Sequence, residues 1–168
     1  MRLYRLTKSQ YARDLSGTGA RLFPGRWNPA GVPVLYASAS KALALAEMTL
    51  HVERSDFPHA WVCMELEVPD AWVESAPSWP ELAPPESPEE SRSFGNEWVQ
   101  SMRAPLLRVP SALFTGSGTT GTCEWNAVIN VKHPDVANHL RCADVYPLDV
   151  DVRYQRKMLL PAFQFAWE

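Results

Sequence analysis

The sequence predicts an α+β fold, with a short-stranded β-sheet core and a few helices, in a single domain over residues 1–168. Three observations support this prediction. The chain has 168 residues, of which 46% are hydrophobic, which is enough for one core. Short apolar runs with the two-residue period of strands recur along it, while only two segments have clear helical character. Strands and helices do not alternate regularly, which argues against a doubly wound sheet.

The expected elements follow in chain order. Leu3–Leu6 and Val34–Ala37 are predicted strands, and Ser38 or Ser40 offers an N-cap for an Ala- and Leu-rich helix that extends to about residue 51. Trp61–Val68 alternates between apolar and polar residues as a strand does. The remaining predictions are a helix over Phe94–Met102 and strands over Leu106–Phe114, Ala127–Val131 and Val145–Val152.

Residues 74–92 differ in composition from the rest of the chain, with five Pro, five Glu and four Ser among 19 residues. This composition disfavours a helix or a strand ladder, so we expect a loop within the domain. The loop carries a net charge of −4 and the whole chain −3, so the remainder carries +1. A basic excess of the kind that binds nucleic acid is therefore not expected.

Cysteine and histidine usage gives no metal-binding signal. Cys63, Cys123 and Cys142 include no C-x-x-C pair, and no two of the four histidines are four residues apart. The apolar stretches are far shorter than the roughly 20 residues of a membrane-spanning helix. The first residues leave no room for a signal-peptide apolar region, so we expect a cytoplasmic protein without a membrane contact.

Glu47 is the first candidate for chemistry. It lies four residues after Leu43 and three before Leu50, so on a helix it points the same way as both. A carboxylate within an apolar stripe costs several kcal/mol unless it is paired. The residues leave two interpretations open: a carboxylate with a partner or a task, and a boundary residue whose head group reaches water.

A glycine-rich segment over residues 17–31 contains the string Gly25-Arg26-Trp27-Asn28. Glycines allow the backbone to approach a ligand closely, and an arginine can bind phosphate through two hydrogen bonds. The segment matches neither the Rossmann fingerprint nor the P-loop. A Ser111–His133–Glu47 hydrolase triad is disfavoured, because no G-x-S-x-G elbow surrounds Ser111.

Taken in order, these pieces resemble the RES domain family of bacterial toxins. The resemblance runs from Arg5 to about Arg153 and rests on the order and spacing of its motifs. The family's paired glycines before Arg-Trp-Asn are Pro24-Gly25 here, and the segment between Ser111 and Asn126 is longer than usual. The matching pieces are Arg5, Gly25-Arg26-Trp27-Asn28, the strand with Tyr36, the helix with Glu47 and His51, Val109-Pro110-Ser111, and Asn130 with His133-Pro134.

The resemblance implies an ADP-ribosyltransferase-like fold and an enzyme that consumes NAD. Such an enzyme cleaves the nicotinamide–ribose bond with water or phosphate as acceptor, as an NAD glycohydrolase or an NAD phosphorylase. NAD is then the substrate, no metal is implied, and the partner is an Xre-type helix-turn-helix antitoxin. Transfer of ADP-ribose to a protein and a non-enzymatic protein-binding module stay open as alternatives.

The resemblance also implies roles for the candidate residues. Glu47 would stabilise the oxocarbenium-like cation that develops on the ribose. Tyr36 would stack on nicotinamide or orient the ribose, and Ser111 would hydrogen-bond a ribose hydroxyl or the acceptor. On the cofactor side, Arg5 and Arg26 would hold the pyrophosphate and adenosine, Asn28 would brace the glycine loop, and Asn130 and His133 would shape the pocket.

Overall fold

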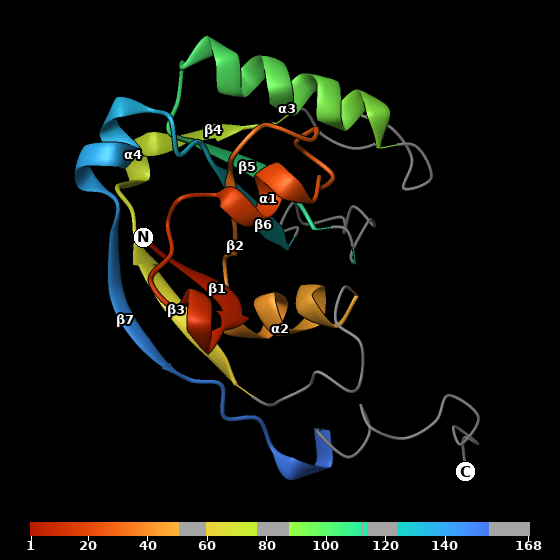
Figure 1. Cartoon of the computed structure of the whole chain (residues 1–168), viewed down its shortest axis with the longest axis vertical. Coiled ribbons are helices and arrows are strands. Elements are labelled where there is room, and N and C mark those ends of the chain that lie inside the picture. Colours follow the sequence, from red (N-terminus) through yellow and green to blue (C-terminus); the bar gives the residue numbers. More distant parts are fainter. Residues whose placement is uncertain (51–59, 77–87, 112, 114–123, 155–168) are drawn as a thin grey trace.

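The computed structural model describes residues 1–50, 60–76, 88–111, 113 and 124–154. The described strands are β1 (Arg2–Lys8), β2 (Leu35–Ser38), β3 (Trp61–Glu67), β4 (Val73–Ser75), β5 (Leu106–Pro110), β6 (Trp125–Ile129) and β7 (Arg141–Pro147). They form one sheet in the order β4-β5-β6-β2-β1-β3-β7 (Figure 1). Neighbouring strands are antiparallel, except β4 and β5, which are parallel.

Four α-helices and two short 3-10 turns accompany this sheet in the described ranges, in addition to helical residues 152–154. They are α1 (Thr18–Leu22), α2 (Lys41–Thr49), α3 (Glu89–Ser101), α4 (Pro134–His139), η1 (Ser9–Tyr11) and η3 (Asp70–Trp72). A mixed sheet with helices outside regular βαβ units confirms the predicted α+β class. Within the described part of the chain, no helix has the length and apolar character that crossing a membrane requires.

Apolar side chains pack on both faces of the sheet. On β2, Leu35 belongs to one core cluster and Tyr36 packs against the other, as the alternation of a strand requires. We name the two faces after these residues. The Tyr36 face is covered over β5 and β6 by α3, whose Trp98 is completely buried against Leu107 and Val128. Helix α2 packs against β1 and β2.

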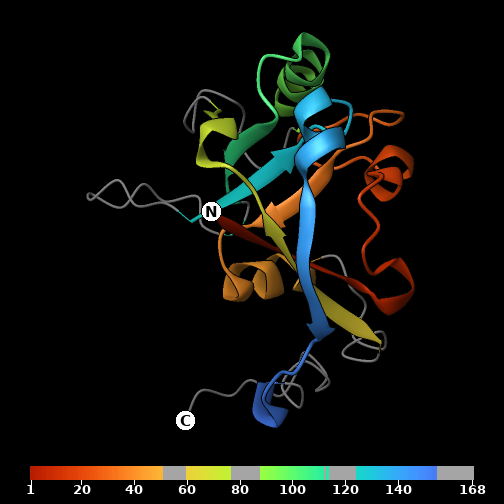
Figure 2. The same cartoon turned by 90° about the vertical axis from the view of Figure 1, so that its left-hand side faces the viewer.

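The sheet has a seam between β1 and β2. Across the described residues these two strands share one register pair, Tyr4 with Ser38, whereas β1 and β3 pair along seven positions. The chain between β1 and β2 passes from one face to the other, because Leu15 packs on the Leu35 face and Ala20 on the Tyr36 face. Figure 2 shows η1 and α2 on opposite sides of the β1–β3–β7 strands.

The prediction of a loop over residues 74–92 is wrong at both ends. At one end, β4 extends into the segment as far as Ser75. At the other end, α3 already begins at Glu89. Proline is tolerated where Pro88 stands, just before the first helical turn. Two acidic residues in that turn, Glu89 and Glu90, complement the positive end of the helix dipole. Residues 77–87 of this segment lie outside the described residues.

Other boundaries differ by a few residues from those expected. Ser40, not Ser38, caps α2, with its side chain accepting a hydrogen bond from Leu43 N at 3.1 Å. β5 ends earlier than expected, β6 begins two residues earlier, and β7 begins at Arg141. Helix α4 was not predicted, although its start signals are present: His133 caps it and Pro134 occupies its first position.

Candidate active site

The carboxylate of Glu47 is the meeting point of three distant parts of the chain. Its Oε1 atom accepts a hydrogen bond from Ser111 Oγ at 2.7 Å and another from Asn126 Nδ2 at 2.6 Å. Glu47 lies in the last half of α2, Ser111 directly after β5, and Asn126 in β6. Hydrogen bonds to an ionised acceptor are short and strong, so this pair of donors fixes the orientation of the carboxylate.

Both donors are themselves held in place. Ser38 Oγ donates to Asn126 Oδ1 at 2.7 Å, which turns the amide so that its Nδ2 faces Glu47. Ser111 is completely buried, and its hydroxyl accepts a hydrogen bond from Leu113 N at 3.1 Å. These contacts hold both donors beside the carboxylate.

The sheet register explains why these residues meet. In the antiparallel ladder, Asn126 stands opposite Ser38 on one side and opposite Val109 on the other. Ser111 follows Val109 by two residues and so continues on the same face. Leu43 and Met48 bury one side of α2, and Glu47, four residues after Leu43 on the same side of the helix, reaches this polar row.

A second group lies in the segment Gly25–Asn28, which we call the Arg26 loop. Two of its backbone N–H groups are bound by side chains. Gly25 N donates to Asn28 Oδ1 at 3.0 Å, and Trp27 N donates to the Tyr36 hydroxyl at 3.1 Å. The Tyr36 hydroxyl in turn donates to Asn28 Oδ1 at 2.8 Å. Burial raises the pKa of Tyr36 well above its ordinary value, so the hydroxyl stays protonated as this network requires.

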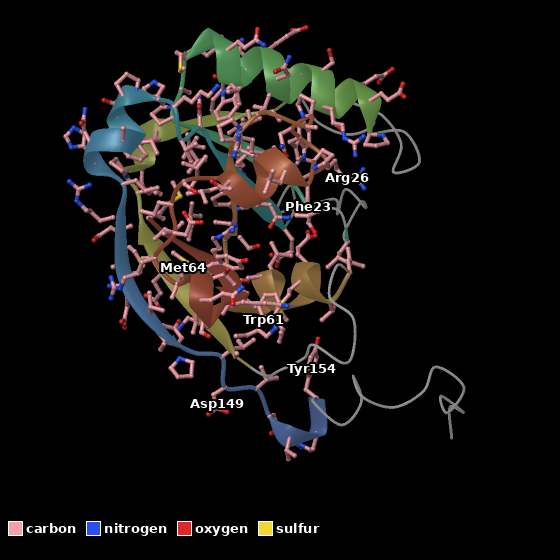
Figure 3. All side chains as sticks on the ribbon, viewed as in Figure 1. Phe23, Arg26, Trp61, Met64, Asp149 and Tyr154 are labelled. Atoms are coloured by element: carbon pink, nitrogen blue, oxygen red, sulfur yellow. The ribbon has the colours of Figure 1, made fainter. Side chains whose placement is uncertain are left out.

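Helix α3 binds the carbonyl side of the same loop. Arg92 Nε donates to Gly25 O at 2.8 Å, and Ser91 Oγ donates to Arg26 O at 2.8 Å. The next carbonyl, that of Trp27, lies so close to Gly95 that an added Cβ at that glycine would overlap it. The backbone that carries Arg26 is therefore held on both sides. In Figure 3, Arg26 lies near the start of α3.

The two groups are anchored at neighbouring positions of β2. Tyr36, under the Arg26 loop, and Ser38, beside Asn126, lie on one face of the strand and two residues apart, about 7 Å at the strand rise. Glu47, Ser111, Tyr36 and the Arg26 loop thus lie on the same face of the sheet, the Tyr36 face. Asn28, the last residue of the loop, is fully buried, and its amide nitrogen donates to Ala20 O and Val32 O.

Arg5 lies on the opposite face of the sheet. It pairs with Met64 in the ladder, and its NH1 atom donates to Tyr36 O at 3.1 Å across the seam. Its Nε atom is buried, with no hydrogen-bond partner in the described part of the chain. Burial lowers the pKa of Arg5, and the negative charge of Asp14 opposes that effect. The structure thus separates Arg5 from the Glu47 group.

Asn130 directly follows β6, about 13 Å from Asn126 at the strand rise, and His133 is the N-cap of α4. Asn130 is completely buried and donates to Val99 O at 2.9 Å. The His133 ring nitrogen Nε2 lies 3.1 Å from Met102 O. These contacts join the C-terminal end of α3 to the segment before α4, so both residues brace α3 here.

Two parts of this arrangement were not predicted from the sequence. Asn126 was not singled out, although an asparagine on the same strand face as Val128 is a signal, because asparagine is disfavoured in strands. Ser91 and Arg92 fell within the expected loop. Among the described residues, no cluster of three or more metal-ligating side chains occurs, and Cys63 and Cys142 are free thiols. Cys123 and most of the long segment after Ser111 lie outside the described residues.

Comparisons with known proteins identify the family. The model of the RES domain matches residues 2–151. "Prs ADP-ribosylating toxin" from Sphingobium sp. (strain YBL2) is 37% identical over 156 residues, covering 87% of this chain and 89% of that protein. "Toxin Res" from Pseudomonas putida is 40% identical over 138 residues, covering 80% of this chain and 87% of that protein.

A solved structure shares the fold. The M. tuberculosis MbcT–MbcA toxin–antitoxin complex contains a chain that matches with a TM-score of 0.59 and 18% identity, covering 94% of this chain and 88% of that one. The fold match and the family model both span most of the chain. The chain belongs to the RES domain family.

Proposed function

We propose that this protein is the toxin of a toxin–antitoxin pair and that it consumes NAD by cleaving the nicotinamide–ribose bond. The observation that carries the proposal is the Glu47 carboxylate, oriented by Ser111 and Asn126 beside the Arg26 loop. Membership of the RES domain family supports it, as do the relatives named as toxins. The fold likeness to a chain of a toxin–antitoxin complex supports an antitoxin partner, for which the Xre type is our proposal.

The chemistry needs a fixed negative charge. When the nicotinamide–ribose bond breaks, nicotinamide leaves with the electron pair and positive charge develops on the ribose. A carboxylate beside the ribose stabilises that transition state more than the ground state. Glu47 fills this role in the proposal, while Ser111 and Asn126 orient its carboxylate. Loss of such an electrostatic group commonly costs about 10²- to 10³-fold in rate.

Arg26 binds the pyrophosphate in this proposal. A guanidinium can bind two phosphate oxygens at once, and a backbone already fixed loses little freedom on binding. Tyr36 acts as a positioning residue here, because its hydroxyl is engaged with Trp27 N and Asn28. Asn28 and Asn130 support the loop and α3, and Arg5 supports the seam.

The acceptor divides the proposal into alternatives. With water the product is ADP-ribose, and with phosphate it is ADP-ribose carrying a new phosphate at the cleaved position. A protein acceptor is the second candidate, because one relative at 37% identity is named an ADP-ribosylating toxin. All three share the same bond cleavage and the same role for Glu47.

The test is to incubate the purified protein with NAD, with and without inorganic phosphate, and to follow nicotinamide and ADP-ribose products by chromatography. Glu47→Gln should lower nicotinamide release about 10²- to 10³-fold. Glu97→Gln, at an exposed carboxylate of α3, is the matched control and should release nicotinamide at the wild-type rate. Undiminished release by Glu47→Gln would remove Glu47 from the reaction.

Labelled NAD separates the acceptors. Label that co-elutes with a macromolecule on size exclusion identifies a protein acceptor, whereas label in small products identifies water or phosphate. Absence of nicotinamide release from folded, antitoxin-free protein, with and without added protein acceptors, would contradict the proposal as a whole.

A further inference from the structure

Helix α2 begins with a residue that its own helix disfavours. Lys41 occupies the first position of α2, where the positive end of the helix dipole repels a cation. Its ammonium group lies 3.0 Å from Glu65 Oε1 on β3. The same group lies 4.7 Å from the ring centre of Tyr146 on β7 and 5.3 Å from that of Tyr4 on β1. These contacts with residues of three strands oppose the unfavourable dipole.

Glu65 is the centre of this cluster. Its side chain is nearly buried, the residue being 8% exposed, and the Tyr146 hydroxyl donates to Oε1 at 2.8 Å. Arg2 NH1 donates to Oε2 at 3.2 Å. The hydrogen bond from Tyr146 and the charge of Lys41 lower the pKa of Glu65, so the carboxylate is ionised at neutral pH. We call Lys41, Glu65, Tyr146 and Tyr4 the Lys41 cluster.

The two ends of α2 are bound to different halves of the sheet. The Lys41 cluster ties its first turn to β1, β3 and β7, on one side of the seam. Glu47 ties its other end to Asn126 of β6 and to Ser111 after β5, on the other side. Helix α2 therefore spans the seam between Tyr4 and Ser38, where β1 and β2 share one register pair.

This arrangement makes the position of Glu47 sensitive to the first turn. Lys41 and Glu47 are six residues apart, about 9 Å along a helix, so a tilt of about 6° moves Glu47 by roughly 1 Å. A misplacement of that size can cost about 10²-fold in rate. Formation of the helix does not depend on Lys41, because Ser40 supplies the cap and Leu43 and Met48 supply the buried face.

We propose that the Lys41 cluster is a positioning device for Glu47, which holds α2 across the seam of the sheet at the tilt that bond cleavage requires. This inference rests on the proposed function. Lys41, Glu65 and Tyr146 contact no substrate in it and act through the placement of α2.

The first arm of the test uses kinetics. Lys41→Met removes the ion pair and the ring contacts and should lower kcat for nicotinamide release about 10- to 100-fold, with KM changed by less than about twofold. Lys41→Arg should restore most of the loss. The matched control is Arg103→Met, which removes an ion pair with Glu74 at 2.8 Å and a ring contact with Phe94 at 6.0 Å. It should leave kcat unchanged.

A fall in kcat that Arg103→Met reproduces, or one that only follows the folded fraction, would overturn the inference. The second arm does not need activity. Lys41→Met should accelerate amide hydrogen exchange in residues 41–49, and Arg103→Met should not. Unchanged exchange in α2 would overturn the inference. If the wild type releases no nicotinamide, the proposed function fails, while the exchange arm still decides whether the cluster holds α2.

Discussion

At the scale of single residues, the Glu47 carboxylate is oriented by a hydroxyl and an amide, which are neutral donors. Neutral donors fix a carboxylate without cancelling its charge, so the negative potential that a developing cation needs is retained. The amide has the stricter role, because its other atom is committed to Ser38 and it cannot rotate freely. Replacing this one amide therefore tests whether the charge of Glu47 matters.

Asn126→Asp puts a second carboxylate at the position of the amide, 2.6 Å from Glu47 Oε1. Like charges at such a separation raise the pKa of one member of the pair. We expect nicotinamide release to fall at least about tenfold at pH 7 and the acid limb of its pH–rate profile to move to higher pH. Asn138→Asp, at an exposed position of α4, is the control. A profile with an unmoved acid limb contradicts the prediction.

Tyr36→Phe removes a buried hydroxyl that joins Trp27 N and Asn28 Oδ1. The partners left unsatisfied should lower the free energy of unfolding by about 1–3 kcal/mol. Urea denaturation measures this difference. Tyr11→Phe removes a hydroxyl from a residue that is 52% exposed and should leave the midpoint unchanged. Equal midpoints for Tyr36→Phe and wild type would show that the hydroxyl does not hold the Arg26 loop.

The residues of the candidate site were unequally predictable. Glu47 stands out because an acid within an apolar helical stripe needs a reason, and Ser111 and Arg26 follow from the resemblance to the family. Asn126 depends on a pairing between β2 and β6, whose partners are about ninety residues apart in the chain. Residue types do not encode such a register, so the donor opposite Glu47 emerged from the fold alone.

At the scale of elements, α3 is the support of the Arg26 loop. Three successive carbonyls of the loop face Arg92, Ser91 and Gly95 of this helix. The first turn of α3 falls within the loop that the composition predicts, because proline and glutamate are frequent there. The same residues are favourable at a helix start, so composition averaged over 19 residues concealed a boundary within them.

Gly95→Ala tests this support by whether the free energy of unfolding rises or falls. In the interior of an exposed helix, alanine is about 1 kcal/mol more favourable than glycine. At Gly95 the added Cβ overlaps the Trp27 carbonyl, so we expect the free energy of unfolding to fall by about 1–3 kcal/mol instead. Gly19→Ala in α1, where nothing lies within 4 Å of the added Cβ, should be neutral or stabilising. Stabilisation by Gly95→Ala would refute the close contact.

Glu65→Gln tests the Lys41 cluster through pH. The pKa of Glu65 is lowered in the folded state, so its contribution to stability is present above its ordinary pKa of 4.5 and is lost as pH falls through the folded value. The Tm difference between wild type and Glu65→Gln should therefore be largest near neutral pH and shrink in acid. Glu97→Gln should show no such trend. A difference that is constant between pH 3 and 7 would contradict the prediction.

At the scale of the whole molecule, the sheet combines two cores with one seam. The α+β class was predictable from short alternating strands, but the strand order was not, because neighbours such as β2 and β6 are distant in sequence. The order and register of the strands depend on how their buried faces pack together in space. The domain expectation over residues 1–168 stays a prediction, and the two cores offer its test.

Leu66→Ala and Leu107→Ala each truncate a completely buried side chain, in the cores of the Leu35 face and the Tyr36 face respectively. Each should lower the free energy of unfolding by about 2–5 kcal/mol. If the chain is one cooperative domain, both variants unfold in a single transition, with coincident midpoints by tryptophan fluorescence and circular dichroism. Two separated transitions, each moved by one variant, would divide the chain into two units.

The packing of Trp27 has a practical consequence for following ligand binding. Trp27 is the neighbour of Arg26, is 2% exposed, and meets the Phe94 ring of α3 edge-on, with 6.3 Å between ring centres. A fluorine atom introduced on this indole would experience the ring current of Phe94. It would lie one residue from Arg26, the proposed pyrophosphate contact. Its resonance would report movement of the loop in the absence of turnover, so binding could be titrated even in the Glu47→Gln variant.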